Sequence, residues 1–135
     1  MLAAWAAGWS LGLPVAAWLE QPVAGVLVVI AGMATTVWGR LAFAKAGTEV
    51  MPASPANKAL VTGGPFGFTR NPMYLGLLAI TIGIALIVGT LTMLAAPVAF
   101  FLWVNFVSIP FEEAKMERQF GDMYREYKKR VRRWV

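Results

Sequence analysis

The sequence predicts an all-α, polytopic membrane protein with four transmembrane helices and a C-terminal amphipathic helix at the membrane surface. Hydrophobic residues make up 59% of the 135 residues and charged residues only 14%, unlike most soluble domains. Charges are also absent from three long runs, residues 1–19, 21–39 and 71–111. The length allows one domain, so residues 1–135 are expected to form a single unit.

These charge-free runs set the expected spans. A helix of about 20 residues crosses the hydrocarbon core of a bilayer, so the first two runs predict helices over about 2–19 and 22–44. A secretory signal peptide has basic residues ahead of its apolar stretch, and the first run has none, so we expect a membrane helix there. The third run is too long for one crossing and is expected to fold back at Gly89-Thr90, giving helices over about 72–88 and 91–109.

The remaining segments are polar or amphipathic. Prolines and glycines in residues 45–71 exclude a long helix, and the length is unusual for a plain connection, so we expect an ordered loop suited to holding a ligand. Pro110 is expected to end the fourth span. An interfacial helix with one apolar face is predicted over 111–133. Gly121-Asp122 is expected to divide it, with Gly ending one helix and Asp capping the next.

The basic residues predict the orientation. All 12 Lys and Arg residues lie around the connection between the second and third spans or after the fourth, and the opposite-side connections have none. By the positive-inside rule, both termini, the 45–71 loop and the C-terminal helix are cytoplasmic. Basic residues that lie against membrane lipids account for the net charge of +5. No nucleic-acid partner is therefore expected.

Two residue types are absent, cysteine and histidine. Their absence excludes disulfides, thiolate nucleophiles, Cys-based metal sites and Ser-His hydrolysis. The seven acidic residues show no spacing typical of a metal cage, so no metal is expected. Any reaction must need little acid–base chemistry from side chains, or be carried by a cofactor.

The stretch GPFGFTRNPMYLG, residues 64–76, has two interpretations. Asn71 as N-cap and Pro72 at the first helical position make a good helix start, with Arg70 and Tyr74 at the headgroup level. The same helix start exposes backbone N–H groups beside Arg70, which suit a carboxylate or a phosphate.

The acidic pair Glu112-Glu113 has a similar ambiguity. Two carboxylates suit the first turn of a helix. Glu113, however, is in register with Met116, Phe120 and Tyr124, and a carboxylate on that apolar face requires a cationic partner.

Together these segments resemble a known family. The segment ALVTGGPFGFTRNPMYLG, a hydrophobic hairpin and then EEAKMERQFGDMYREYKKRV are similar to the integral-membrane isoprenylcysteine carboxyl methyltransferases and phospholipid N-methyltransferases. The resemblance covers roughly residues 38–133 and rests on Leu60, Val61, Thr62, Gly64, Phe66, Arg70, Pro72, Tyr74, Glu112, Glu113, Phe120, Gly121, Tyr124 and Tyr127. Two positions depart from the family pattern. The usual histidine before Pro72 is Asn71, and Ser108 replaces the substrate-binding arginine of the carboxyl methyltransferases.

The resemblance implies S-adenosylmethionine as methyl donor, bound between the loop, the start of the third span and the Glu-Glu helix. The cofactor-binding residues that it implies are Lys58, Ala59, Leu60, Val61, Phe66, Asn71, Pro72, Met73, Tyr74, Glu112 and Glu113. The ammonium and sulfonium of this cofactor suit the two carboxylates. Methyl transfer depends on positioning and desolvation more than on a strong base, so the absence of His and Cys is tolerable.

The methyl acceptor is expected to be a lipophilic small molecule or a lipid. Arg70, Asn105 and Ser108 are the candidate substrate-binding residues, although Asn105 and Ser108 also suit polar contacts between membrane helices. Ser108 in place of arginine argues against a carboxylate substrate and favours an amine, a thiol or a lipid headgroup. No catalytic residue is assigned, and the oligomeric state stays open.

Two other functions remain open. The chain also fits a membrane reductase resembling the sterol reductases, for which NADPH binding would be diagnostic. It also fits a non-catalytic membrane scaffold that has kept the methyltransferase shape, as Asn71 and Ser108 suggest. Cofactor binding without turnover would identify the scaffold.

Overall fold

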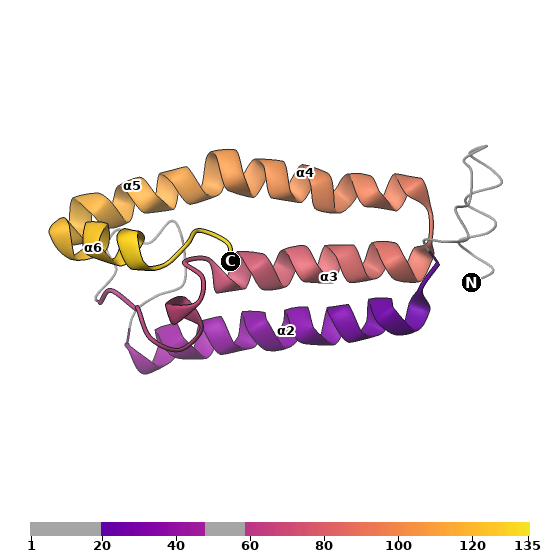
Figure 1. Ribbon diagram of the computed structural model, residues 1–135, viewed down its shortest axis with the longest axis horizontal. Coiled ribbons are helices and arrows are strands. Elements are labelled where there is room, and N and C mark those ends of the chain that lie inside the picture. The colour runs from indigo at the N-terminus through magenta and orange to yellow at the C-terminus, as the bar shows by residue number, and fades with distance from the viewer. Residues whose placement is uncertain (1–19, 48–58) are drawn as a thin grey trace.

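The computed structural model describes residues 20–47 and 59–135. Within these ranges the chain is helical and has no extended strand. Three helical rods lie side by side (Figure 1): α2 (Pro22–Lys45), α3 (Pro72–Val88) and a long rod from Leu91 to Phe120. The helix predicted over 2–19 lies outside the described residues, as does much of the loop, Lys58 included.

The long rod has four parts. They are η2 (Leu91–Leu94), a 3₁₀ turn, then α4 (Ala95–Trp103), a π-helical turn named η3 (Val104–Ser108) and α5 (Ile109–Phe120). A further 3₁₀ turn, η1 (Gly64–Gly67), precedes α3, and α6 (Asp122–Arg130) follows α5. Residues 131–135, here called the tail, lead from α6 back toward the start of α3 (Figure 1).

Two of these helices are long and apolar enough to cross a membrane, Pro22–Lys45 and Leu91–Phe120. Helix α3 is apolar but shorter, with 17 residues. The helices predicted over 22–44 and 72–88 are therefore present with nearly the expected bounds. On α2, large apolar side chains such as Leu27 and Ile30 are more than half exposed, as expected of a surface that faces lipid.

The prediction that Pro110 ends the helix is wrong, because the rod continues to Phe120. Just before the proline the helix widens into the π turn, in which the Ile109 N–H donates to the Val104 carbonyl, five residues back. In that register the next donor would be the Pro110 nitrogen, which carries no hydrogen. The π turn thus absorbs the proline and leaves the Asn105 carbonyl open to a donor from elsewhere.

Helices α2 and α3 pack through a stripe of glycines spaced seven residues apart. Gly25, Gly32 and Gly39 of α2 and Gly76 and Gly83 of α3 are all buried. A Cβ atom added to Gly32 would lie 2.6 Å from the Gly76 carbonyl oxygen, and one added to Gly25 would lie 2.6 Å from that of Gly83. Small residues let the backbones of membrane helices approach this closely, so the stripe fixes α3 against α2.

The predicted break in the C-terminal helix is confirmed at Gly121, where φ is 54° and ψ is −123°. Side chains disfavour positive φ, so glycine suits this position. Gly121 itself occupies the cap position and Asp122 is the first residue of α6, so the prediction that Asp122 caps the helix is wrong. Helix α6 ends at Arg130, before the expected residue 133, and the tail then continues in non-helical conformation.

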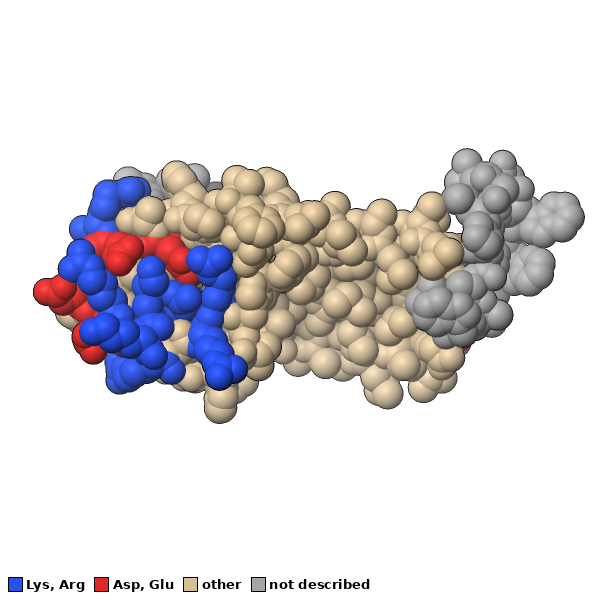
Figure 2. Space-filling model, turned by 45° about the horizontal axis from the view of Figure 1, so that its top comes forward, with Lys and Arg blue, Asp and Glu red and all other residues tan. Residues whose placement is uncertain are grey.

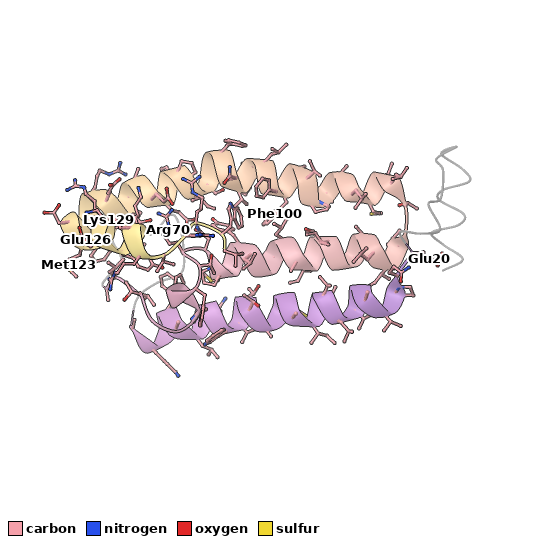
Figure 3. All side chains as sticks on the ribbon, viewed as in Figure 1. Glu20, Arg70, Phe100, Met123, Glu126 and Lys129 are labelled. Carbon is pink, nitrogen blue, oxygen red and sulfur yellow. The ribbon has the colours of Figure 1, made fainter. Side chains whose placement is uncertain are left out.

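Charged side chains gather at one end of the molecule. On the face drawn in Figure 2, acidic and basic residues cover the end formed by α5, α6 and the tail, and the rods beyond them are uncharged. Figure 3 shows Glu126 and Lys129 at this end and Glu20 at the opposite one. This segregation agrees with the orientation predicted from the sequence, which remains a prediction.

Candidate functional site

A cavity of about 70 Å³ lies at the charged end of the molecule. Its walls come from the end of α2, the loop before α3, the start of α3, and α5 and α6. The lining residues are Phe43, Leu60, Val61, Phe66, Arg70, Asn71, Pro72, Met73, Tyr74, Glu112, Glu113, Met116, Tyr124 and Tyr127.

Most of the residues that the family resemblance assigned to the cofactor line this one cavity. They are Leu60, Val61, Phe66, Asn71, Pro72, Met73, Tyr74, Glu112 and Glu113. Ala59 is described but does not line it, and Lys58 lies outside the described residues. Of the three candidate substrate residues, Arg70 lines the cavity and Asn105 and Ser108 do not.

Glu113 is the buried centre of an ion cluster. Its side chain is only 10% exposed, and its two oxygens lie 3.0 Å from Arg70 Nη1 and 2.8 Å from Arg133 Nη2. Glu113 was expected to have one cationic partner, and it has two. Arg70 lies just before α3, and Arg133 lies in the tail. Two guanidinium groups and one carboxylate leave the cluster with a net positive charge.

Arg70 retains unused donors inside the protein. Although Nη1 is close to Glu113, its N–H groups do not point at the carboxylate, and Nη1 and Nε are both buried with no hydrogen-bond partner among the described residues. Arg70 also contacts the Tyr124 hydroxyl; burial, followed by the Glu113 carboxylate, raises the pKa of Tyr124 to about 12. Tyr124 is thus a neutral donor at physiological pH. Buried N–H groups without partners are costly, so Arg70 is suited to receive an anionic group.

Glu112 has different surroundings from its neighbour. The Tyr74 hydroxyl donates to Glu112 Oε1 at 2.5 Å, and Ser108 also interacts with that hydroxyl. The hydrogen bond of Glu112 therefore goes to a neutral group, whereas Glu113 holds both arginines. Ser108, predicted to bind substrate, supports the Tyr74–Glu112 pair from outside the cavity.

The side chain of Asn71 does not cap α3, although Asn71 occupies the predicted cap position. Its Nδ2 instead donates to the Arg133 carbonyl at 2.9 Å. Asn105 behaves similarly: its Oδ1 accepts from Trp134 Nε1 at 3.0 Å. Both asparagines thus hold the tail, which sequence reasoning did not anticipate.

Four lining residues were missed as site residues: Phe43, Met116, Tyr124 and Tyr127. The two tyrosines belong to the Phe-Gly-x-x-Tyr-x-x-Tyr pattern that carried the family resemblance, so a signal existed. Phe43 is one apolar residue in an apolar stretch, and Met116 belongs to the apolar face of an amphipathic helix, so neither pattern indicates a site.

Changing Tyr127 to phenylalanine is expected to destabilise the protein by about 1–2 kcal/mol. The Tyr127 hydroxyl is buried and donates to the Phe66 carbonyl at 2.7 Å, and its loss leaves that carbonyl without this donor. Thermal unfolding in detergent measures the change. Phe68→Leu serves as control, because Phe68 is exposed and lies in the same loop as Phe66; its effect on stability should be near zero. Equal stability of the Tyr127 variant and the wild type would contradict the prediction.

Two larger hollows adjoin the cavity. One of about 470 Å³ shares Leu60 with it and extends toward Met123 and Glu126 of α6. Another of about 260 Å³ shares Tyr127 with it, and Thr62 and Arg130 with the first hollow. The loop and α6 therefore border two further hollows beside the motif residues.

Apolar helices with a motif-lined cavity at their charged end fit the membrane methyltransferase architecture that the resemblance implied. The chain belongs to the phospholipid methyltransferase family, whose sequence model matches residues 21–123. It is also similar to an uncharacterized protein of Haemophilus influenzae, with 41% identity over 63 residues that make up 47% of this chain and 100% of that protein. No solved structure matches the chain.

Proposed function

We propose that this protein transfers a methyl group from S-adenosylmethionine to a lipophilic or membrane-embedded acceptor, an amine, a thiol or a lipid headgroup. The observation that carries this proposal is the convergence of the three motif segments on one cavity, whose lining includes both Glu112 and Arg70. By the positive-inside rule, the segregated basic residues support a cytoplasmic location for the cofactor site and for both termini.

The charges of the site fit this cofactor. The ammonium and sulfonium would be held by Glu112, and the carboxylate by Arg70 with the N–H groups at the start of α3. The apolar walls, including Phe43, Phe66 and Met73, suit its less polar parts. The cavity alone, at about 70 Å³, is below the roughly 300 Å³ typical of small-molecule sites, so the proposal also uses the adjoining hollows.

When bound, the cofactor supplies an activated methyl group on a sulfonium. That methyl group would pass to an acceptor with a free lone pair, and the acceptor would release a proton to solvent. The Tyr74–Glu112 pair would accept a hydrogen bond from the acceptor and so orient its lone pair. The apolar walls exclude water and fix the approach, which is what this reaction chiefly requires.

Changing Glu112 to glutamine is expected to weaken binding of S-adenosylmethionine by about tenfold or more, because a hydrogen bond to a charged group is worth about 1.5–3 kcal/mol. Isothermal titration of detergent-purified protein with this cofactor and with its demethylated product measures the effect. Glu117→Gln is the matched control, since Glu117 lies one turn along α5, pairs with Arg125 and Lys128 and does not line the cavity.

Absence of saturable binding to folded wild-type protein would refute the proposed function. NADPH binding under the same conditions would then support the reductase. Cofactor binding without methyl transfer to any lipid, amine or thiol would support the scaffold.

A further inference from the structure

The tail is attached to three elements that surround the cavity. The Arg132 carbonyl accepts from the Arg70 N–H at 2.9 Å, and the Arg133 carbonyl accepts from Thr69 Oγ1 at 3.1 Å and from Asn71 Nδ2 at 2.9 Å. The Arg133 side chain pairs with Glu113 of α5. Backbone carbonyls and a buried ion pair thus hold the tail firmly as far as Arg133.

Beyond Arg133 the attachments are fewer. The Trp134 ring stacks on Phe101 of α4 at a centroid distance of 5.3 Å, and its Nε1 donates to Asn105. Arg133 Nη1 reaches the Asn105 carbonyl, which the π turn leaves open, at 3.4 Å; this bond is long and therefore weak. Trp134 can be released without disturbing the bonds that hold Arg132 and Arg133.

Trp134 covers one face of the long rod. Phe101, Asn105, Ile109 and Glu113 recur every four residues and so share a face. The tail lies along it, with Arg133 against Glu113 and Trp134 against Asn105 and Phe101. In Figure 3, Arg70 lies between α3 and α5, inward of Glu126 and Lys129.

Among the described helices, two seams lead from the sides of the molecule toward Tyr74 and Glu112. The seam between α2 and α3 is closed by the backbone contacts of the glycine stripe. Helix α3 packs much less closely on α4, so the seam between α3 and the long rod is the more open one. The tail lies beside this second seam, with Trp134 on the α4 side.

We propose that Trp134 is the gate through which a chain-bearing acceptor enters, and that it determines which acceptors are used. This inference rests on the proposed function. The acceptor it implies is an amphiphile with a terminal amine or thiol, whose head reaches the cavity while its chain passes Trp134. Short acceptors do not require the gate to open.

The test compares alkylamines and alkanethiols of short and long chain as acceptors of labelled methyl groups in detergent-solubilised protein. Trp134→Ala is expected to raise the ratio of kcat/KM for long over short acceptors about tenfold, the scale of a changed apolar contact, with unchanged binding of S-adenosylmethionine. Trp134→Phe, which keeps the stack on Phe101 and loses the bond to Asn105, should give an intermediate ratio. Trp103→Ala is the control: it removes an exposed tryptophan of α4, the helix that carries Phe101. This variant should leave the ratio unchanged.

An unchanged ratio in Trp134→Ala, or an equal fall for both chain lengths, would overturn the gate, since a merely structural tryptophan predicts those results. Wild-type protein that binds the cofactor but methylates neither series would overturn it as well, because the implied acceptor class is then wrong. Failure of the cofactor to bind at all would instead refute the proposed function.

Discussion

Replacing Glu113 with alanine is expected to cost about 3–5 kcal/mol of folding free energy, the cost of breaking a buried ion pair from one side. The variant leaves the guanidinium of Arg70, 11% exposed, in a buried site without its carboxylate. Arg133, whose side chain is 34% exposed, can turn to solvent and contributes less. The charged end of the molecule, where α5, α6 and the start of α3 meet, should unfold first. Denaturant or SDS titration of the detergent-solubilised protein, followed by tryptophan fluorescence, measures the change.

A second variant separates the ion cluster from simple loss of volume. Arg70→Met combined with Glu113→Leu removes both buried charges together, and buried pairs replaced this way often lose little stability. The double variant should therefore be more stable than Glu113→Ala alone. Glu117→Ala, at the more exposed carboxylate of the same helix, should change stability by less than about 0.5 kcal/mol. A Glu113→Ala variant as stable as Glu117→Ala would contradict the account of the cluster.

Changing Gly32 to valine is expected to separate α2 from α3 and to cost about 3 kcal/mol or more, the upper range for overpacked sites. The added Cβ would lie 2.6 Å from the Gly76 carbonyl oxygen and 2.9 Å from Ile80 Cγ1. A backbone oxygen cannot move aside without shifting the helix that carries it. The same unfolding titration measures the loss. Binding of S-adenosylmethionine should weaken too, since the stripe positions Asn71–Tyr74.

Gly63→Ala is the control for this prediction. An added Cβ there meets nothing within 4 Å, so stability should change little. If Gly32→Val and Gly63→Ala were equally stable, the close approach of α2 and α3 would be wrong.

Much of the helical arrangement follows from the sequence, because a helix that crosses a bilayer needs about 20 residues without charge. The charge-free runs therefore indicate where the helices lie. The helices α2 and α3 begin at Pro22 and Pro72, as the proline rule for helix starts predicts. The glycine stripe was not anticipated, because a period of seven in an apolar helix gains meaning only when the facing helix is known. Pro110 was misjudged for a related reason: the local rule ends a helix there, and the structure instead absorbs the proline in a π turn.

The lining of the cavity could be predicted where the motif is contiguous. Asn71–Tyr74 and Glu112-Glu113 line the cavity, as the resemblance implied. Their division of labour was predicted only in part. The register of Glu113 indicated a cationic partner, but the identity of its two arginines, and the contact of Glu112 with Tyr74, depend on residues distant in sequence. The role of the tail was also hidden, since its partners Thr69, Asn71 and Asn105 are distant in sequence.

The π turn at Val104–Ser108 also sets the rotational phase of everything after it. A π turn amounts to one residue inserted into an α-helix, and each residue rotates the helix by about 100°. Without that extra residue, α5 would present a different side to α3, and Glu112 and Glu113 would turn away from Tyr74 and Arg70. The alignment of both carboxylates with their partners therefore depends on a single added residue, and the carbonyl that this insertion leaves open gives Arg133 a second, weaker contact with the long rod.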